Sequence, residues 1–272
     1  MVPIAKPVIA EPVVLEPSRT VERPVMLQGW YNLTSIHWRY DPAVVQALLP
    51  EGFTVDTFDG SAWIGLIPFH MRRIRLPFGP NGGIAAGRFS TFPETNVRTY
   101  IVRPDGRRAV WFFSLDITRI APTLVARIFY GLPYCWARMT IDAQPDDPTG
   151  TVIRYTSTRR WPSSKSTVVA ESRVTIRIGD LIPAANIAPD GLGAFLSARW
   201  ALGSTFLRRL VWADVAHPTW ELHEAELLEC NESMVTATGL PPPSGDPIVL
   251  WSPGVEVRIG RPTFVKGFMK SG

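Results

Sequence analysis

Hydrophobic and polar residues alternate with a period of two along much of the chain, a pattern typical of β-strands. The segments that this pattern predicts as strands are 29–40, 53–58, 61–75, 88–102, 109–117, 134–141, 151–161, 167–178 and 248–259. Asp59-Gly60 predicts a hairpin between 53–58 and 61–75, and Pro104-Asp105-Gly106 predicts a second one between 88–102 and 109–117.

Fewer segments have helical spacing. Asp41-Pro42 supplies an N-cap and a first-turn proline for a short helix over Ala43–Leu49. The segments 118–130 and 192–209 are also predicted as helices, and the glycine-rich segment 77–87 is predicted as a mobile loop. Many strands joined by hairpins, with a few short helices, predict a single α+β domain that is mainly antiparallel β, either a barrel or a sandwich.

Composition and length narrow the class of protein. The chain has 272 residues, 46% of them hydrophobic and 19% charged, an ordinary globular mix. Prolines crowd the N-terminal region and predict a flexible leader over 1–26, followed by one domain over 27–265. No apolar run is long enough to cross a bilayer, the prolines interrupt any signal-like stretch, and two cysteines make no disulfide framework. We therefore expect a cytoplasmic protein with no membrane association.

The basic residues are almost all arginines. Of 28 basic residues only Lys6, Lys165, Lys266 and Lys270 are lysines, and the net charge is +4. The densest cluster of arginines lies within 72–75, whereas a nucleic-acid surface needs many converging cations. We expect no nucleic-acid partner.

The segment 94–100 places polar side chains on one face of a strand. Successive side chains point to opposite faces, so one face carries Glu94, Asn96, Arg98 and Tyr100. Two environments of this strand face fit the pattern. The face either lines a polar barrel interior, or it is an exposed edge with a Glu94–Arg98 ion pair that contributes little to stability.

The hairpin around Asp105 predicts the partners of this face. The predicted pairs are Arg98–Phe112, Asn96–Ser114 and Glu94–Asp116. A slip of one residue instead brings Trp111, Phe113 and Leu115 to this face.

Such a face has clear chemical uses in an enclosed site. Arg98 is suited to hold a carboxylate or carbonyl group, and Glu94 to act as general acid or base. Arg98 lowers the pKa of Glu94 and Asp116 raises it, and the sequence leaves that balance open.

Several motifs, in one order over residues 27–262, resemble a known family. They are FPETNVRTY (92–100), HWRYDP (37–42), VDTFDG (55–60), WFFSLD (111–116), GLPY (131–134) and WSPGV (251–255). The resemblance is to the YqjF-like family of uncharacterised bacterial proteins, in the acetoacetate-decarboxylase-like superfamily. It implies a cone-shaped antiparallel β-barrel with a central cavity, often in a homo-oligomer, and it implies no known reaction.

Decarboxylases of that superfamily act through a lysine that forms a Schiff base. The resemblance places Tyr134 where the nucleophilic lysine would be and Cys135 where its partner would be, and it matches Glu94 to the superfamily's barrel glutamate. No lysine lies on a predicted cavity strand, so we expect no Schiff-base chemistry. Tyr134 is either a hydrogen-bond donor or general acid, or an aromatic residue of the barrel wall.

Two functions remain open. The first is a lyase, hydratase or isomerase of a carbonyl or carboxylate compound; the second is a non-catalytic protein that binds or sequesters a small molecule. The candidate catalytic residues are Glu94, Arg98 and Tyr134, and the candidate substrate-binding residues are Asn96, Tyr100, Ser114, Asp116, Trp38 and Trp63. No two histidines have the i,i+4 spacing of a zinc-binding helix. His217, Glu221 and His223 are close enough in sequence to share a metal, but no known ligand motif accompanies them, and we expect neither a metal nor a cofactor.

Overall fold

The computed structural model describes residues 8–17, 19–76, 84–85, 90–119, 131–143, 149–162 and 168–265. The helix expected over 118–130 and most of the loop expected over 77–87 lie outside these residues. Among the described residues, no helix reaches the length and apolarity needed to cross a membrane.

The described chain forms one 14-stranded sheet with a few short helices. The strands are β1 (Met26–Tyr40), β2 (Thr54–Val55), β3 (Ala62–Leu76), β4 (Ile84–Ala85), β5 (Phe92–Val102), β6 (Arg108–Ile117), β7 (Tyr134–Asp142), β8 (Val152–Trp161), β9 (Glu171–Leu181), β10 (Ala201–Phe206), β11 (Arg209–Ala216), β12 (His223–Glu232), β13 (Ile248–Ile259) and β14 (Thr263–Phe264). The helices are α1 (Pro42–Gln46) and α3 (Leu192–Ser197), with 3-10 turns η3 (Ala184–Asn186) and η4 (Thr236–Thr238).

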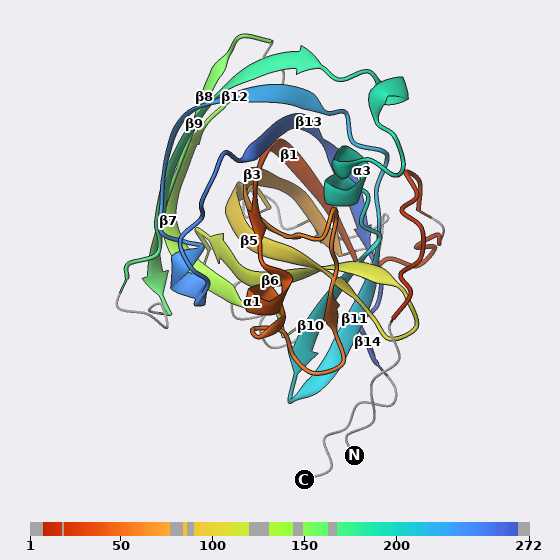
Figure 1. Cartoon of the computed structure of the whole chain (residues 1–272). Coiled ribbons are helices and arrows are strands. Elements are labelled where there is room, and N and C mark those ends of the chain that lie inside the picture. The colour runs from red at the N-terminus through yellow and green to blue at the C-terminus, as the bar shows by residue number, and fades with distance from the viewer. Residues whose placement is uncertain are drawn as a thin grey trace.

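The sheet closes into two rings. In the smaller ring the order is β5-β6-β10-β11-β13-β1-β3, and in the larger ring it is β6-β7-β8-β9-β12-β13-β1-β3-β5. The rings share β1, β3, β5, β6 and β13. Most pairs are antiparallel, while β6 is parallel to both β7 and β10. In Figure 1 the strands β7, β8, β9 and β12 curve around the shared strands as an outer wall.

Strand β5 is shared by both rings, and none of its residues from Phe92 to Val102 is exposed. The core of the smaller ring includes Phe69 and Ile117, and helix α3 adds Phe195 and Leu196 to it. The core of the larger ring is a separate cluster that includes Val97 of β5. A polar side chain on either face of β5 is therefore inside the protein.

The mainly antiparallel β fold and most of the predicted strands are confirmed. The helix expected over 192–209 is wrong beyond Ser197, because the chain continues as β10 between β6 and β11. An apolar stretch of this kind fits either a helix or a strand buried on both faces. Packing decides here: a Cβ at Gly203 would lie 2.6 Å from Ile101 and 3.1 Å from Phe53.

The first predicted hairpin is only partly correct. Asp59 and Gly60 both have positive φ, as a tight turn requires, and the bridge between Phe58 and Ser61 closes it. The segment before the turn, however, pairs through β2 with β5 and not with β3. The strand β12 has no counterpart among the predicted elements.

The second predicted hairpin forms between β5 and β6, and its register changes midway. Arg98 lies opposite Phe112, as predicted. Beyond a bulge at Phe113 the prediction is wrong by one residue, and the observed pairs are Asn96–Leu115 and Glu94–Ile117. Ser114 and Asp116 therefore lie on the opposite face of β6, because a shift of one residue exchanges the two faces.

The described part of residues 8–25 has no helix or strand and lies against the sheet. The Glu11 amide donates to the Gly106 carbonyl (2.8 Å), and the Val25 amide donates to the Ile259 carbonyl (2.8 Å). The flexibility expected of this leader stays a prediction.

The close approach of β13 to β1 requires glycine at position 254. Gly254 has φ +130°, and a Cβ there would lie 2.1 Å from the Trp30 carbonyl oxygen. We expect Gly254→Ala to lower the free energy of unfolding by about 2–4 kcal/mol, measured by urea unfolding. Gly245→Ala is the control, since φ there is also positive (+74°) but nothing lies within 4 Å; its expected loss is about 1 kcal/mol. Equal losses in the two variants would contradict the steric explanation.

Candidate functional site

Strand β5 carries a row of polar side chains that faces the interior of the smaller ring. The row consists of Glu94, Asn96, Arg98 and Tyr100. Phe69 on β3 and Ile117 on β6 lie opposite Glu94, and both belong to the core of that ring. Opposite residues of an antiparallel pair share a face, so the row is internal. Glu94 and Arg98 form no ion pair within the described chain, and the exposed-edge interpretation is wrong.

Glu94 is a buried carboxyl group that favours its neutral form. Its side chain is 2% exposed, and Oε2 has no hydrogen-bond partner among the described residues. Burial, and then the nearby charge of Asp116, raise the pKa of Glu94 to about 8. Desolvation therefore dominates the balance that the sequence left open, and the group is largely protonated at neutral pH.

Arg98 is a half-buried cation with no carboxylate partner in the described part of the chain. Its Nη2 donates to the Tyr100 hydroxyl and to the Leu196 carbonyl, both at 3.3 Å. Its Nε is buried and has no partner among the described residues. Burying a charge without a counter-ion is costly, so the Arg98 guanidinium is suited to bind an anion.

His37 joins the Arg98 end of the row. It lies on β1, is 1% exposed, and places Nε2 2.7 Å from the Tyr100 hydroxyl. Burial and the positive charge of Arg98 hold the pKa of His37 well below its ordinary value, so the imidazole is neutral. Arg98, Tyr100, His37 and the Leu196 carbonyl thus form one hydrogen-bonded cluster.

Three other predicted site residues face the interior of the smaller ring. Asn96 is 6% exposed, and its Oδ1 has no partner within the described chain. Tyr134 is half-buried, packs against the core of the smaller ring, and lies opposite Leu115, which itself lies opposite Asn96. Trp63 is fully buried in that core.

The other three predicted residues belong to the larger ring. Trp38 packs in its core, and Ser114 and Asp116 face it because of the bulge in β6. Asp116 is fully buried and accepts two hydrogen bonds from Arg159, at 2.8 and 2.7 Å. Grouping Ser114 and Asp116 with Glu94 on one face is therefore wrong. Arg159 lies 43 residues away from Asp116, and no local pattern indicates the pair.

A second buried charge cluster flanks Tyr100, and no sequence pattern indicates it. Arg199 donates to Asp56 at 2.6 Å, and Arg108 donates to the same carboxylate. The Arg199 guanidinium lies 4.6 Å from the centre of the Tyr100 ring. Arg199 is 143 residues from Asp56, so only the folded chain brings them together.

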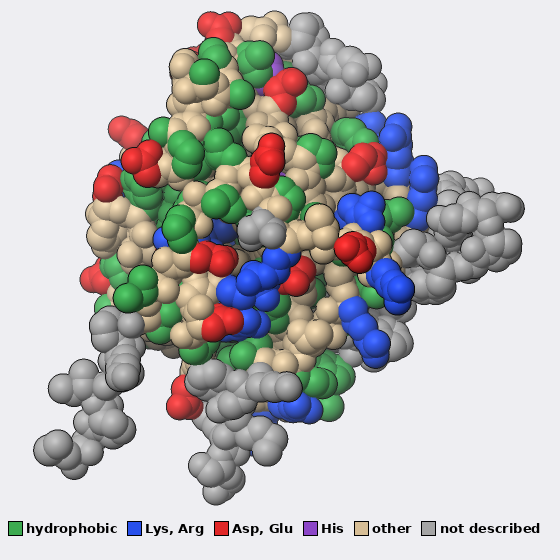
Figure 2. Space-filling model, turned by 90° about the vertical axis from the view of Figure 1, so that its right-hand side faces the viewer, with side chains coloured by type: hydrophobic (Ala, Val, Ile, Leu, Met, Phe, Trp, Pro, Cys, Tyr) green, Lys and Arg blue, Asp and Glu red, His purple; other side chains and the backbone are tan. Residues whose placement is uncertain are grey.

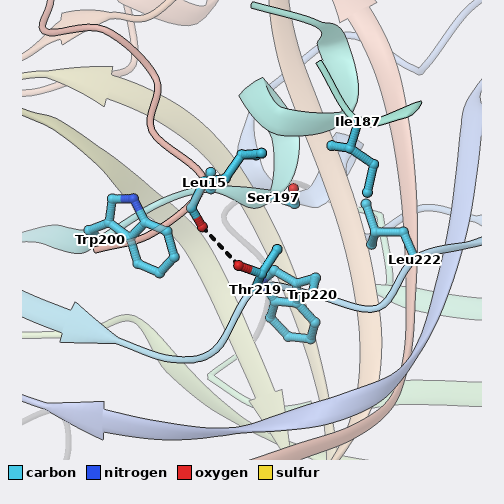
Figure 3. Close-up of a pocket in the computed structure, with 8 residues that line it drawn as sticks. Leu15, Ile187, Ser197, Trp200, Thr219, Trp220 and Leu222 are labelled. Carbon is cyan, nitrogen blue, oxygen red and sulfur yellow. Dashed lines mark hydrogen bonds between the residues drawn. The ribbon is translucent and has the colours of Figure 1, made fainter. Parts of the chain in front are cut away.

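A small pocket lies beside the end of α3 (Figure 3). It is lined by Leu15, Ile187, Ser197, Ala198, Trp200, Thr219, Trp220 and Leu222. Its volume of about 10 Å³ is room for a single water molecule. The Thr219 hydroxyl donates to the Leu15 carbonyl at 3.2 Å and holds the N-terminal segment against the pocket. As it stands, this pocket is too small for a metabolite.

Neither the surface charges nor the potential metal ligands of the described chain indicate a second site. On the face shown in Figure 2, acidic side chains lie among the basic ones. Arg73, from the densest arginine cluster, is paired with Glu256 at 3.3 Å. No three His, Cys, Asp or Glu side chains of the described chain lie close enough to hold a metal ion. The expectations about nucleic acid and metal stay predictions.

Solved structures share this fold. An acetoacetate decarboxylase-like enzyme from Sphingomonas wittichii RW1 matches with a TM-score of 0.57 and 14% identity, over 92% of this chain and 96% of that chain. The enduracididine biosynthesis enzyme MppR complexed with pyruvate matches with a TM-score of 0.56 and 15% identity, over 94% and 98%. Acetoacetate decarboxylase from Legionella pneumophila matches with a TM-score of 0.54 and 12% identity, over 88% and 86%. At these identities the similarity shows the fold, which is acetoacetate-decarboxylase-like as predicted.

Sequence comparison identifies closer relatives. The uncharacterized protein YqjF of Bacillus subtilis (strain 168) is 29% identical over 233 residues, which cover 86% of this chain and 89% of YqjF. The model of the DUF2071 family, described as an uncharacterized conserved protein, matches residues 27–256. Most of the strands of both rings lie within that match, and the chain therefore belongs to the DUF2071 family.

Proposed function

We propose that the protein binds a small carboxylate compound with a carbonyl group inside the smaller ring and moves a proton on it, as a lyase, hydratase or isomerase without Schiff-base chemistry. Arg98 binds the carboxylate, Glu94 transfers the proton, and Asn96 or Tyr134 orients the carbonyl oxygen. One observation carries the proposal: Arg98 has no counter-ion in the described chain, while Glu94 on the same strand face is buried and has a raised pKa.

The spacing of the two groups indicates a short substrate. Four residues of strand separate the Cα atoms of Glu94 and Arg98 by about 13 Å. Both side chains are long, and Asn96 lies between them on the same face. We therefore expect a 2-oxo acid of a few carbons, with its carboxylate toward Arg98 and its reactive carbon toward Glu94.

The proton transfer needs no other reactant. Ionised Glu94 takes a proton from the carbon next to the carbonyl group, which leaves an enolate, and protonated Glu94 returns that proton to the same or a neighbouring atom. The raised pKa supports this role, because a carboxylate with a pKa of about 8 is a much stronger base than an ordinary one.

The lysine positions support chemistry without an imine. A Schiff base requires a lysine amine, and all four lysines lie outside the described residues, so no described strand carries one. The MppR structure of the same fold is complexed with pyruvate, a 2-oxo acid, which supports the choice of substrate class.

The second candidate function is binding without turnover. It is favoured by the resemblance that places Tyr134 and Cys135 at the position of the superfamily's lysines. A ligand that raises the melting temperature and is recovered chemically intact supports this function, whereas any turnover excludes it.

The stability of the folded protein is expected to fall with rising pH because of Glu94. Its pKa rises from 4.5 to about 8 on folding, so its stabilising contribution is complete below pH 4.5 and is lost as pH rises through about 8. The free-energy difference between the wild type and Glu94→Gln, measured by urea unfolding, should change by up to about 5 kcal/mol across this window. The exposed-site variant Glu224→Gln should follow the wild type. A pH-independent effect of Glu94→Gln would show that the carboxyl group is not held neutral.

Proton exchange tests the catalytic role of Glu94. The protein is incubated in D2O with pyruvate or 2-oxobutyrate, and NMR follows loss of the signal of the protons next to the carbonyl. We expect catalysed exchange that rises with pH and levels off above about 8, because ionised Glu94 is the base. Glu94→Gln should slow it at least about 100-fold and Glu224→Gln should not change it. Exchange that is equally fast in Glu94→Gln excludes this role.

Calorimetric binding of pyruvate tests the role of Arg98. Arg98→Gln removes the charge-assisted hydrogen bonds to the carboxylate and should raise the Kd about 10- to 100-fold. Acetone lacks the carboxylate, and its binding should not respond to the substitution. Arg154→Gln, at an exposed position of β8, is the matched control. If Arg98→Gln binds pyruvate as the wild type does, Arg98 is not the anion site.

A further inference from the structure

A glycine in β3 allows an imidazole to reach across the sheet. His37 on β1, Gly65 on β3 and Arg98 on β5 lie opposite one another in a single cross-strand row. A Cβ at Gly65 would lie 2.6 Å from Nε2 of His37 and 2.9 Å from its Cδ2. The ring therefore occupies the space over Gly65, and only glycine leaves that space free.

The hydroxyl group that His37 reaches has no hydrogen-bonding capacity to spare. A tyrosine hydroxyl has one proton and two lone pairs. The oxygen of Tyr100 lies 2.7 Å from Nε2 of His37, 2.8 Å from the Leu196 carbonyl oxygen and 3.3 Å from Nη2 of Arg98. These three partners account for its one donor and two acceptor positions. A ligand can bond to it only by displacing one of them.

The Tyr100 ring is itself held in place. The Arg199 guanidinium lies 4.6 Å from its centre, and Phe195 packs edge-on at 5.3 Å. The side chain is 0% exposed. A fixed ring with a fully engaged hydroxyl is a rigid support for the Arg98 side chain, whose Nη2 donates to that hydroxyl.

We propose that His37 and Tyr100 are positioning residues for Arg98. The imidazole over Gly65 fixes the Tyr100 hydroxyl, and this hydroxyl together with the Leu196 carbonyl holds Nη2 of Arg98, so that Nε is left to donate to a carboxylate oxygen of the ligand. The inference rests on the proposed function for the identity of the ligand. It also reassigns Tyr100, which the sequence suggested as a direct substrate contact, to a role exerted through Arg98.

The energetic basis is preorganisation. A free arginine side chain loses rotational entropy when it binds a ligand, and a guanidinium already held by two acceptors loses less. The Nε donor is buried and has no partner in the described chain, so accepting a carboxylate oxygen relieves the cost of an unmade hydrogen bond.

A double-mutant cycle with pyruvate as the probe tests the inference. Tyr100→Phe and His37→Phe should each weaken binding about five- to twentyfold, and His37→Gln, whose amide can replace Nε2, should restore most of it. In the Arg98→Gln background, Tyr100→Phe should have no further effect. His223→Gln is the control, because this histidine bonds to Gly179 and Glu221 instead. Urea unfolding checks that each variant is folded.

The possible outcomes separate the inference from the proposed function. If Tyr100→Phe weakens binding equally with and without Arg98, then Tyr100 contacts the ligand directly and the inference is overturned. If Arg98→Gln itself has no effect, or the wild type binds no pyruvate, the proposed function fails for this probe, and the following measurement decides the positioning role without any ligand.

The Nε–H signal of Arg98 reports its immobilisation in the free protein. We expect a sharp 15N-correlated signal in the wild type and in His37→Gln. In Tyr100→Phe it should broaden or exchange with solvent about tenfold faster, since Nη2 loses a partner. The same change is expected in His37→Phe, since the Tyr100 hydroxyl that holds Nη2 loses the imidazole that fixes it. A purely structural role of Tyr100 would change the unfolding midpoint and leave this signal sharp, which would overturn the inference.

Discussion

Every side chain of β5 has to be accommodated inside the protein, because β5 is paired along both edges and faces a ring interior on each side. Carboxyl, amide and guanidinium groups on such a strand cannot be solvated and must find partners within the fold. The Tyr100 hydroxyl does so completely, whereas one oxygen of Glu94, Oδ1 of Asn96 and Nε of Arg98 have no partner in the described chain. Unsatisfied groups that share one buried face carry a free-energy cost that a ligand can offset, and this makes the smaller ring the candidate site.

The two rings also divide the charges between them. The bulge in β6 sends Asp116 into the larger ring, where Arg159 neutralises it with two hydrogen bonds. Glu94 and Arg98 face the smaller ring and do not pair with each other. Asp116 still acts through the sheet, because its charge adds to desolvation in raising the pKa of Glu94. The larger ring thus helps to raise the pKa of a group that it does not contain.

The shared fold does not imply shared chemistry. The solved structures that match share this fold at 12–15% identity, a level at which catalytic residues need not be retained. In this chain the described strands offer a protonated carboxyl group, a guanidinium without a carboxylate partner and a neutral imidazole, and they offer no lysine. These groups suit anion binding and proton transfer more directly than attack on a carbonyl carbon.

Alternation along the chain was enough to predict that Glu94, Asn96, Arg98 and Tyr100 share one face, since a period of two is a property of any extended backbone. The turn between β5 and β6 was also predicted correctly, because turn residues act locally. Everything that depends on distant segments follows only from the folded chain: that this face is internal, that the bulge in β6 removes Ser114 and Asp116 from it, and that His37 and the Leu196 carbonyl complete the cluster. Ring closure, bulges and buried pairs depend on contacts between residues tens of positions apart, and local alternation carries no information about which of these contacts form.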